Sequence, residues 1–206
     1  MSCLFINYRT GDEEGSAALI EGGLSRRFGN DKIFRASKSI RLGEDFEQVI
    51  LRAVRRSNAL IAVIGARWLT APDGHGGRAL DNEADWTRRE IVEALMCDVL
   101  VIPVLIGGTP RLAKDDLPAA LAELAVRQYE RLDHRNVDAD IIRLGDKLAQ
   151  LVDGLDDAAA PADGSVRGAT TQLPHVSARQ GNFFSGPVTA RDVVAGNLYQ
   201  TREDDR

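Results

Sequence analysis

Two uninterrupted apolar runs constrain the fold of this chain more than any other feature of its sequence. They read ALIAVIG at 59–65 and VLVIPVLIG at 99–107, and polar or turn-forming residues flank both of them. A strand made of continuous apolar residues buries both faces, as strands do in parallel sheets that carry helices on either side. Shorter runs at 3–8 (CLFINY) and 32–34 (KIF) indicate two further strands.

Segments with helical spacing of apolar residues lie between and after these strands. The segment 45–57 (DFEQVILRAVRRS) is strongly amphipathic, with Phe46 in its apolar stripe. The other expected helices span 16–28, 83–97, 117–132 and 138–155. Strands that alternate with helices predict an α/β fold with a doubly wound parallel sheet. In such folds the functional site lies beyond the carboxyl ends of the strands.

The helix expected at 83–97 has an unusual distribution of residues, which read EADWTRREIVEAL from Glu83 to Leu95. At about 100° per residue, Ile91, Val92 and Leu95 share one face, and Trp86 and Glu90 fall on roughly the other. Glu90 can be a solvated helix glutamate paired with an arginine, or the carboxylate of a site. Trp86 can likewise cover the edge of the core or form the wall of a cleft.

Composition argues against several classes of function. The formal net charge of −5 disfavours a nucleic-acid-binding role, and no apolar run reaches the roughly 20 residues that span a bilayer. Cys3 and Cys97 lack metal-like or redox spacing, and the three histidines are isolated, so we expect no metal site. Neither GxGxxG nor GxxxxGK[ST] occurs. The expected location is the cytoplasm, without membrane attachment.

The composition changes after Leu155, which divides the chain into three expected parts. Residues 1–155 form the folded domain, 156–181 a flexible linker, and 182–206 a C-terminal tail. The tail stretch NFFSGPVTARDVVAGNLYQ (182–200) has few charges and many β-branched or aromatic residues. Either the C-terminal region is mostly disordered, or this stretch assembles with other copies by cross-β stacking.

Residues 3–155 resemble a TIR (Toll/interleukin-1 receptor) domain, in particular the bacterial and enzymatic members. LFINYR resembles the first-strand motif FISYR, and DWTRREIVEAL resembles the WxxxE helix. The segment from IFRAS to ARWL resembles the stretch that runs through the BB loop into the third strand, and VIPVLIGG followed by LP completes the pattern. The resemblance implies a flavodoxin-like, five-stranded parallel sheet.

Enzymatic TIR domains cleave NAD⁺ between nicotinamide and ribose, and the resemblance implies that Glu90 is the catalytic residue here. It places Tyr8 and Arg9 at the mouth of the site, with Arg9 facing the phosphates. Phe46 would stack on a base unless it belongs to its helix's buried stripe, and Trp86 would form a wall of the cleft. NAD⁺ is then a substrate, so no cofactor is expected. Products would be nicotinamide with ADP-ribose or a cyclic ADP-ribose.

The resemblance also implies self-association, because the BB loop commonly mediates TIR–TIR contacts and active sites are often completed across two protomers. The loop corresponds to Ser39, Ile40, Arg41, Leu42 and Gly43. Two positions depart from the family pattern: Ala36 stands where an acidic residue is frequent, and Leu42 precedes Gly43 where proline is usual.

The tail resembles short amyloid signalling motifs that couple a sensor to an effector in bacterial defence against phage. The residues that would stack are Phe183, Phe184, Val188, Val193, Val194 and Tyr199. A sensor protein with the same motif would be the partner, and clustering would start NAD⁺ consumption and cell suicide.

Two alternatives to an NAD⁺-cleaving enzyme are open. One is a non-catalytic TIR adaptor that assembles through its BB-loop region. The other is a related α/β enzyme that acts on a different N-glycosidic bond. An adaptor would tolerate Glu90→Ala, whereas an NAD⁺-cleaving enzyme would not.

Overall fold

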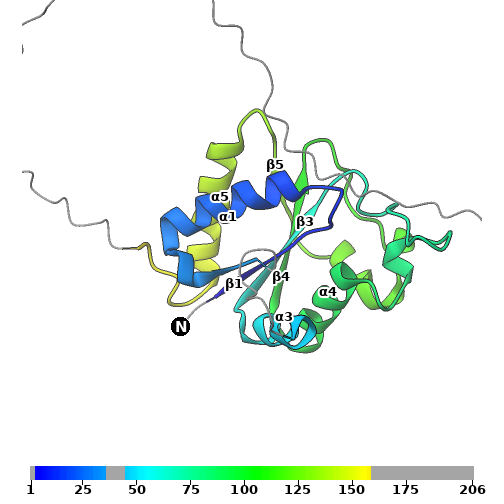
Figure 1. Cartoon of the computed structure of the whole chain (residues 1–206). Coiled ribbons are helices and arrows are strands. Elements are labelled where there is room, and N and C mark those ends of the chain that lie inside the picture. Colours follow the sequence, from blue (N-terminus) through cyan, green and yellow to red (C-terminus); the bar gives the residue numbers. More distant parts are fainter. Residues whose placement is uncertain (1–2, 36–44, 159–206) are drawn as a thin grey trace, which may run out of the picture. The chain divides into compact units, whose positions relative to one another are not determined.

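A five-stranded, all-parallel sheet forms the centre of the domain in the computed structural model, which describes residues 3–35 and 45–158 (Figure 1). The strands are β1 (Leu4–Asn7), β2 (Ile33–Phe34), β3 (Ala59–Ile64), β4 (Leu100–Ile106) and β5 (Glu130–Leu132). Their order across the sheet is β2-β1-β3-β4-β5. The expected doubly wound, five-stranded α/β fold is therefore confirmed.

Helices cover both faces of the sheet (Figure 1). On one face pack α1 (Glu14–Phe28) and α5 (Val137–Leu151); on the other pack α3 (Phe46–Arg56) and α4 (Trp86–Met96). Short 3₁₀ helices also occur: η1 (Asn30–Lys32), η2 (Ala79–Asp81), η3 (Lys114–Asp116) and η4 (Ala119–Ala125).

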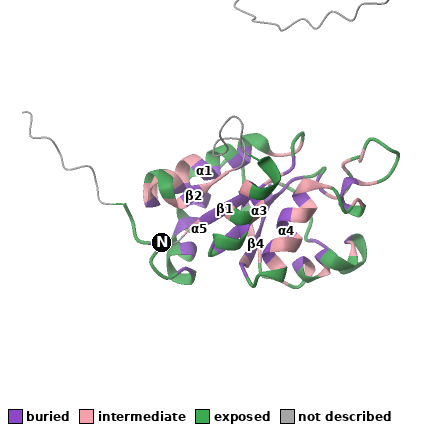
Figure 2. Cartoon of the chain, turned by 60° about the horizontal axis from the view of Figure 1, so that its bottom comes forward, coloured by how far each residue is buried: buried purple, intermediate pink, exposed green. Residues whose placement is uncertain are grey.

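The continuous apolar run of β3 is divided between two cores. Ile61 and Val63 belong to the cluster under α1 and α5, whereas Leu60 and Ile64 belong to the cluster under α3 and α4. All six residues of β3 are buried, because successive side chains point to opposite faces and helices cover both. This is the physical reason why ALIAVI has no polar alternation. The neighbouring strand β1 is buried along its length as well (Figure 2).

The segment 117–132, in which a helix was expected, contains a 3₁₀ helix but no α-helix. The segment forms the 3₁₀ helix η4 and then β5, which pairs with Val104–Ile106 of β4. Leu121 and Leu124, three residues apart, are both buried. A 3₁₀ helix places residues i and i+3 on one side as well as an α-helix does, so the spacing could not distinguish them.

The segment after α5 is held against the carboxyl end of α1. The Arg27 guanidinium donates to Asp157 at 2.7 Å and to Asp146 at 2.6 Å, and the backbone N–H of Ala158 donates to the Arg27 carbonyl oxygen at 2.6 Å. Helix α1 returns from the end of β1 to the start of β2, so Arg27 lies at the amino-terminal edge of the sheet. Residues 156–158 therefore lie at that edge of the sheet.

The BB-loop residues from Ser39 to Gly43, together with Ala36, lie outside the described residues, as do the expected tail residues from Phe183 to Tyr199. Within the part of the chain that the structure describes, no helix is both long and apolar enough to cross a membrane. The same residues contain no group of three or more His, Cys, Asp or Glu side chains that could hold a metal ion.

Candidate active site

The carboxyl end of β1 meets the first turn of α4 at the edge where the fold predicts a site. Asp85 caps α4, and its side chain accepts a hydrogen bond of 2.9 Å from the backbone N–H of Arg88. The Thr87 hydroxyl donates to the carbonyl oxygen of Tyr8 at 3.4 Å. These contacts fix α4 relative to the strand, although about eighty residues separate the two in sequence.

A buried ion pair reinforces this junction. The two terminal nitrogens of Arg9 donate to the two carboxylate oxygens of Asp85, both at 2.8 Å, and Arg9 is only 6% exposed. Bidentate pairs of this kind fix orientation as well as distance. The resemblance implied that Arg9 faces phosphates, but in this structure its guanidinium is engaged with Asp85.

Glu90 points into the protein and is 7% exposed. The side-chain nitrogen of Asn7, the last residue of β1, donates to a Glu90 carboxylate oxygen at 2.7 Å. The expected placement of Glu90 on the face opposite Ile91 is wrong, because the buried residues of α4 are Thr87, Glu90, Ile91 and Ala94. These four residues follow the i, i+3, i+4, i+7 spacing of one helix face, so the buried stripe of α4 runs through Glu90 and not through Val92 and Leu95, which are only partly buried.

Burial sets the protonation of Glu90. Loss of hydration raises the pKa of its carboxyl from 4.5 to about 8, the Asn7 hydrogen bond opposes this rise, and the nearby charge of Asp85 adds to it. A carboxyl group with such a strongly raised pKa at the carboxyl edge of a parallel sheet is a typical feature of functional sites. A solvated helix glutamate would show neither the burial nor the shift.

An aromatic pair lies one helical turn from Glu90. The rings of Trp86 and Phe46 meet edge to face, with centroids 5.1 Å apart and planes at 85°. The Arg89 guanidinium lies 4.3 Å from the Trp86 ring centroid and also pairs with Glu47. Phe46 is 47% exposed, so it is not part of the buried stripe of α3, which consists of Ile50 and Val54.

Tyr8 is placed differently from the other expected site residues. It packs against the core under α1 and α5, whereas Trp86 packs against the core on the opposite face of the sheet. The Arg35 guanidinium lies 6.0 Å from the Tyr8 ring centroid. The structure therefore brings together Glu90, Trp86 and Phe46 on one side, and places the Tyr8 ring on the other.

Sequence reasoning missed Asn7. It is 0% exposed and contacts Glu90 directly, yet it was read only as part of an apolar strand. The available signal was a buried amide at the end of CLFINY, because a polar residue in a strand that is otherwise apolar needs a hydrogen-bonding partner.

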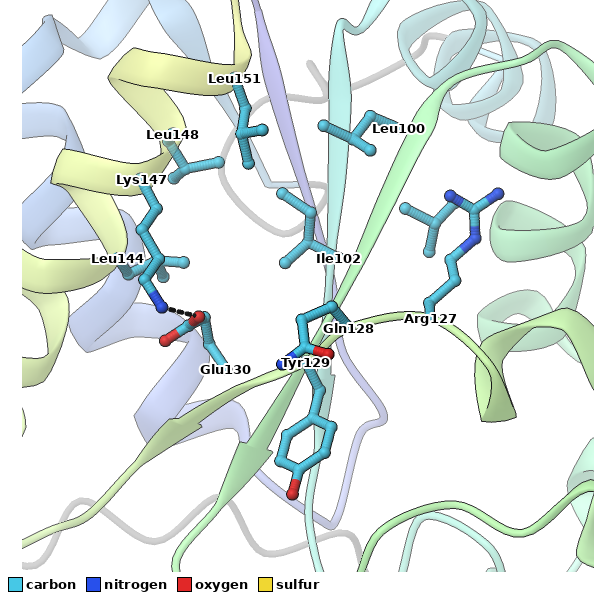
Figure 3. A pocket seen from close by; sticks show the side chains of 11 residues that line it. Leu100, Ile102, Arg127, Gln128, Tyr129, Glu130, Leu144, Lys147, Leu148 and Leu151 are labelled. Carbon is cyan, nitrogen blue, oxygen red and sulfur yellow. Dashed lines mark hydrogen bonds and ion pairs between the residues drawn. The ribbon is translucent and has the colours of Figure 1, made fainter.

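A separate groove lies along the first half of β4 (Figure 3). Strand β5 pairs only with Val104–Ile106, so the described part of the chain places no strand beside Leu100–Pro103 on that side. The groove encloses about 360 Å³. An ion pair between Lys147 and Glu130 borders it. Its apolar lining includes Leu100, Ile102, Tyr129, Leu144, Leu148 and Leu151.

No protein-family model matches the chain, and no curated protein matches it in sequence. Several solved structures do match. The TIR domains of the activated Roq1 resistosome, which directly recognises the pathogen effector XopQ, superpose with a TM-score of 0.51 at 14% identity. That match covers 72% of this chain and 99% of the other.

Two further solved structures are similar. The TIR domain of the Toll-related receptor TRR-2 from Hydra magnipapillata gives a TM-score of 0.46 at 18% identity, over 73% of this chain and 98% of that one. A metazoan TIR-STING receptor from C. gigas, in complex with 2′,3′-cGAMP, gives a TM-score of 0.45 at 25% identity, over 68% of this chain and 38% of that one. The parallel sheet and its two helical layers match the fold of TIR domains.

Proposed function

We propose that this protein is an NAD⁺ glycohydrolase that cleaves the bond between nicotinamide and ribose, with Glu90 as its catalytic residue. The observation that carries the proposal is the buried Glu90 carboxyl, held by Asn7 at the carboxyl edge of the sheet, one turn from the Trp86–Phe46 pair. NAD⁺ enters as substrate, and no resident cofactor takes part.

One carboxylate is sufficient for this chemistry. Glycosidases commonly need a second carboxyl group to protonate the leaving oxygen. Nicotinamide instead departs as a neutral molecule with the electron pair of the broken C–N bond, so no acid is required. The ionised form of Glu90, whose population grows as the pH rises toward its pKa of about 8, stabilises the oxocarbenium-like charge on the ribose. Water then forms the new C–O bond and loses a proton, which gives ADP-ribose; an internal nucleophile gives a cyclic product.

Self-association is the second part of the proposal. The groove beside Leu100–Pro103 offers apolar surface and a strand edge that no other described strand pairs with, and Leu151 at its border is 60% exposed. An edge of this kind is a ready surface for another chain. Clustering of TIR domains would then activate the enzyme, in the cytoplasm of a bacterium that defends itself against phage.

The tail is proposed to supply the clustering, directly or through a sensor with the same motif. The composition of residues 182–200 supports this, with its valines, aromatic residues and few charges. A synthetic 182–200 peptide should form thioflavin-positive fibrils, and removal of residues 159–206 should abolish seeded assembly of the protein. A peptide that stays soluble would exclude an amyloid role for the tail.

Nicotinamide release from NAD⁺ tests the enzymatic proposal. The assay compares artificially clustered wild type with Glu90→Gln and with Glu83→Gln, since Glu83 has an exposed side chain at the start of the same region. We expect release by the wild type and by Glu83→Gln, with a loss of at least about 10³-fold in Glu90→Gln. Equal release by Glu90→Gln would remove Glu90 from the mechanism.

A non-catalytic adaptor is the competing function, and one observation favours it. Arg9 is bound to Asp85 and thus is not free to contact the phosphates of a dinucleotide. Absence of nicotinamide release from all three proteins, while light scattering shows that they assemble, would select the adaptor.

A further inference from the structure

We infer that Asn7 is a positioning residue for Glu90: its side-chain amide, itself oriented by the carbonyl group of Thr87, fixes the direction in which the Glu90 carboxylate faces the substrate. The inference rests on the proposed function only where it refers to a substrate. The geometry between Asn7 and Glu90 stands independently of it.

Two acceptors determine the orientation of the Asn7 amide. Its nitrogen lies 2.7 Å from a carboxylate oxygen of Glu90 and 3.1 Å from the carbonyl oxygen of Thr87. A side-chain amide has two N–H groups on one nitrogen, so a single orientation satisfies both acceptors. The reversed amide would place its oxygen against two other oxygens. Thr87 therefore ensures that Asn7 presents a donor to Glu90.

The opposite end of the same amide makes no comparable contact. The Asn7 side-chain oxygen is buried and accepts no hydrogen bond from the described residues. The amide is therefore held through its nitrogen, by Glu90 and by the carbonyl oxygen of Thr87.

The backbone around Asn7 is fixed as well. Asn7 pairs with Ala62 in the centre of the sheet, and the Thr87 hydroxyl and the Arg9–Asp85 pair anchor the next two residues to α4. The amide therefore acts as a rigid support for the Glu90 side chain. Of the charged groups around Glu90, Asp85 raises its pKa, and Arg9 is paired with Asp85.

A direct test measures the titration of Glu90 in the full chain by carboxyl ¹³C NMR, with the resonance assigned by its absence in Glu90→Gln. In Asn7→Ala the midpoint should rise by about one pH unit or more, because a hydrogen bond to the charged form is lost. Asn7→Val, which keeps the strand position filled, should give the same rise and serves if Asn7→Ala does not fold.

Asn58 provides the matched control at the other end of β1. Its side-chain oxygen accepts a hydrogen bond of 3.0 Å from the backbone N–H of Cys3. Asn58→Ala thus also removes a hydrogen bond that holds β1, but far from Glu90, and it should leave the Glu90 midpoint unchanged. An equal shift in Asn58→Ala and Asn7→Ala would show a merely structural role and overturn the inference.

Kinetics separate this inference from the proposed function. In Asn7→Ala, kcat for nicotinamide release should fall about 10-fold or more at pH 7 with KM within about 2-fold, and the pH profile should shift upward. Asn7→Ser, which retains one donor, should recover part of kcat. If the wild type releases no nicotinamide, the proposed function fails, yet the titration still tests Asn7. An unchanged Glu90 midpoint in the folded Asn7 variants would overturn the inference alone.

Discussion

Gly23 of α1 lies so close to Ile141 of α5 that a Cβ atom added at Gly23 would overlap the branched end of the Ile141 side chain at Cγ2. Helix propensity alone disfavours glycine equally at Gly22 and Gly23. The structure distinguishes them, because a Cβ at Gly22 would have only Arg26 near it, at 3.6 Å. Gly23 allows α1 and α5 to pack closely, whereas a Cβ at Gly22 would make only an ordinary van der Waals contact.

We predict opposite effects for alanine at these two neighbouring positions. Gly23→Ala should lower the free energy of unfolding by about 1–3 kcal/mol, because the helices must move apart. Gly22→Ala should raise it by about 0.5–1 kcal/mol through helix propensity. Urea unfolding followed by circular dichroism measures both. Equal effects of the same sign would contradict the close packing of α1 on α5.

Removal of only one partner of the Arg9–Asp85 pair should strongly lower the free energy of unfolding. Arg9→Ala leaves the Asp85 carboxylate, which is only 14% exposed, without its guanidinium partner, and the expected loss is about 3–5 kcal/mol. The double variant Arg9→Met with Asp85→Leu should lose less free energy of unfolding than the two single variants lose together, because no charge stays buried in it. The four proteins of the cycle are the wild type, Arg9→Met, Asp85→Leu and the double variant, and chemical unfolding measures the free energy of unfolding of each.

The control for this cycle is a second bidentate pair that is exposed. Arg78 donates to both carboxylate oxygens of Asp81 at 2.8 Å, but the side chains are 39% and 52% exposed. Water screens such a pair, so Asp81→Ala should lower the free energy of unfolding by far less than Arg9→Ala does. Similar losses at the two sites would show that burial of Arg9 does not matter.

Glu90 should make stability depend on pH. Its carboxyl has a pKa of about 8 in the folded protein against an ordinary 4.5, so the folded state holds the proton more tightly. This contribution is fully present below about pH 4.5 and is lost as the pH rises through about 8. The side chain that replaces Glu90 in Glu90→Gln stays neutral at every pH. At pH 8 this variant should have a higher free energy of unfolding than the wild type, by a few kcal/mol, because each unit by which the pKa is raised corresponds to about 1.4 kcal/mol.

Thermal or urea unfolding of wild type and Glu90→Gln at pH 5 and pH 8 checks this prediction. The difference between the two proteins should widen with pH, and Glu83→Gln should show no such widening. A difference that stays constant from pH 5 to pH 8 would mean that Glu90 is ionised at low pH despite its burial.

The groove beside β4 leads to a prediction about self-association. Leu151→Asp places a charge at its border, where the side chain is already 60% exposed, so folding should be unaffected. Self-association should weaken by about 10-fold or more in sedimentation experiments, since a charge in an apolar contact must be desolvated. Ile142→Asp is the matched control, because Ile142 lies on the same helix at 61% exposure and does not line this groove.

The centre of the fold could be predicted from the sequence because buried parallel strands carry their signal in every residue, as β3 and β4 do. Strand β5 could not, because Glu130 and Arg131 at the sheet edge are polar and the strand pairs over three residues only. The residue Glu90 was found through its motif, but its inward direction was not. That direction depends on Asn7, a partner 83 residues away in sequence.

The two ends of the described domain lie at the same edge of the sheet, since Leu4 begins β1 there and Ala158 is bound to the carboxyl end of α1. Glu90 lies at the opposite edge. A tag or probe attached close to Leu4 or Ala158 would therefore start on the side of the sheet away from Glu90. Labels placed there report on the protein without standing in front of the Glu90 carboxyl group.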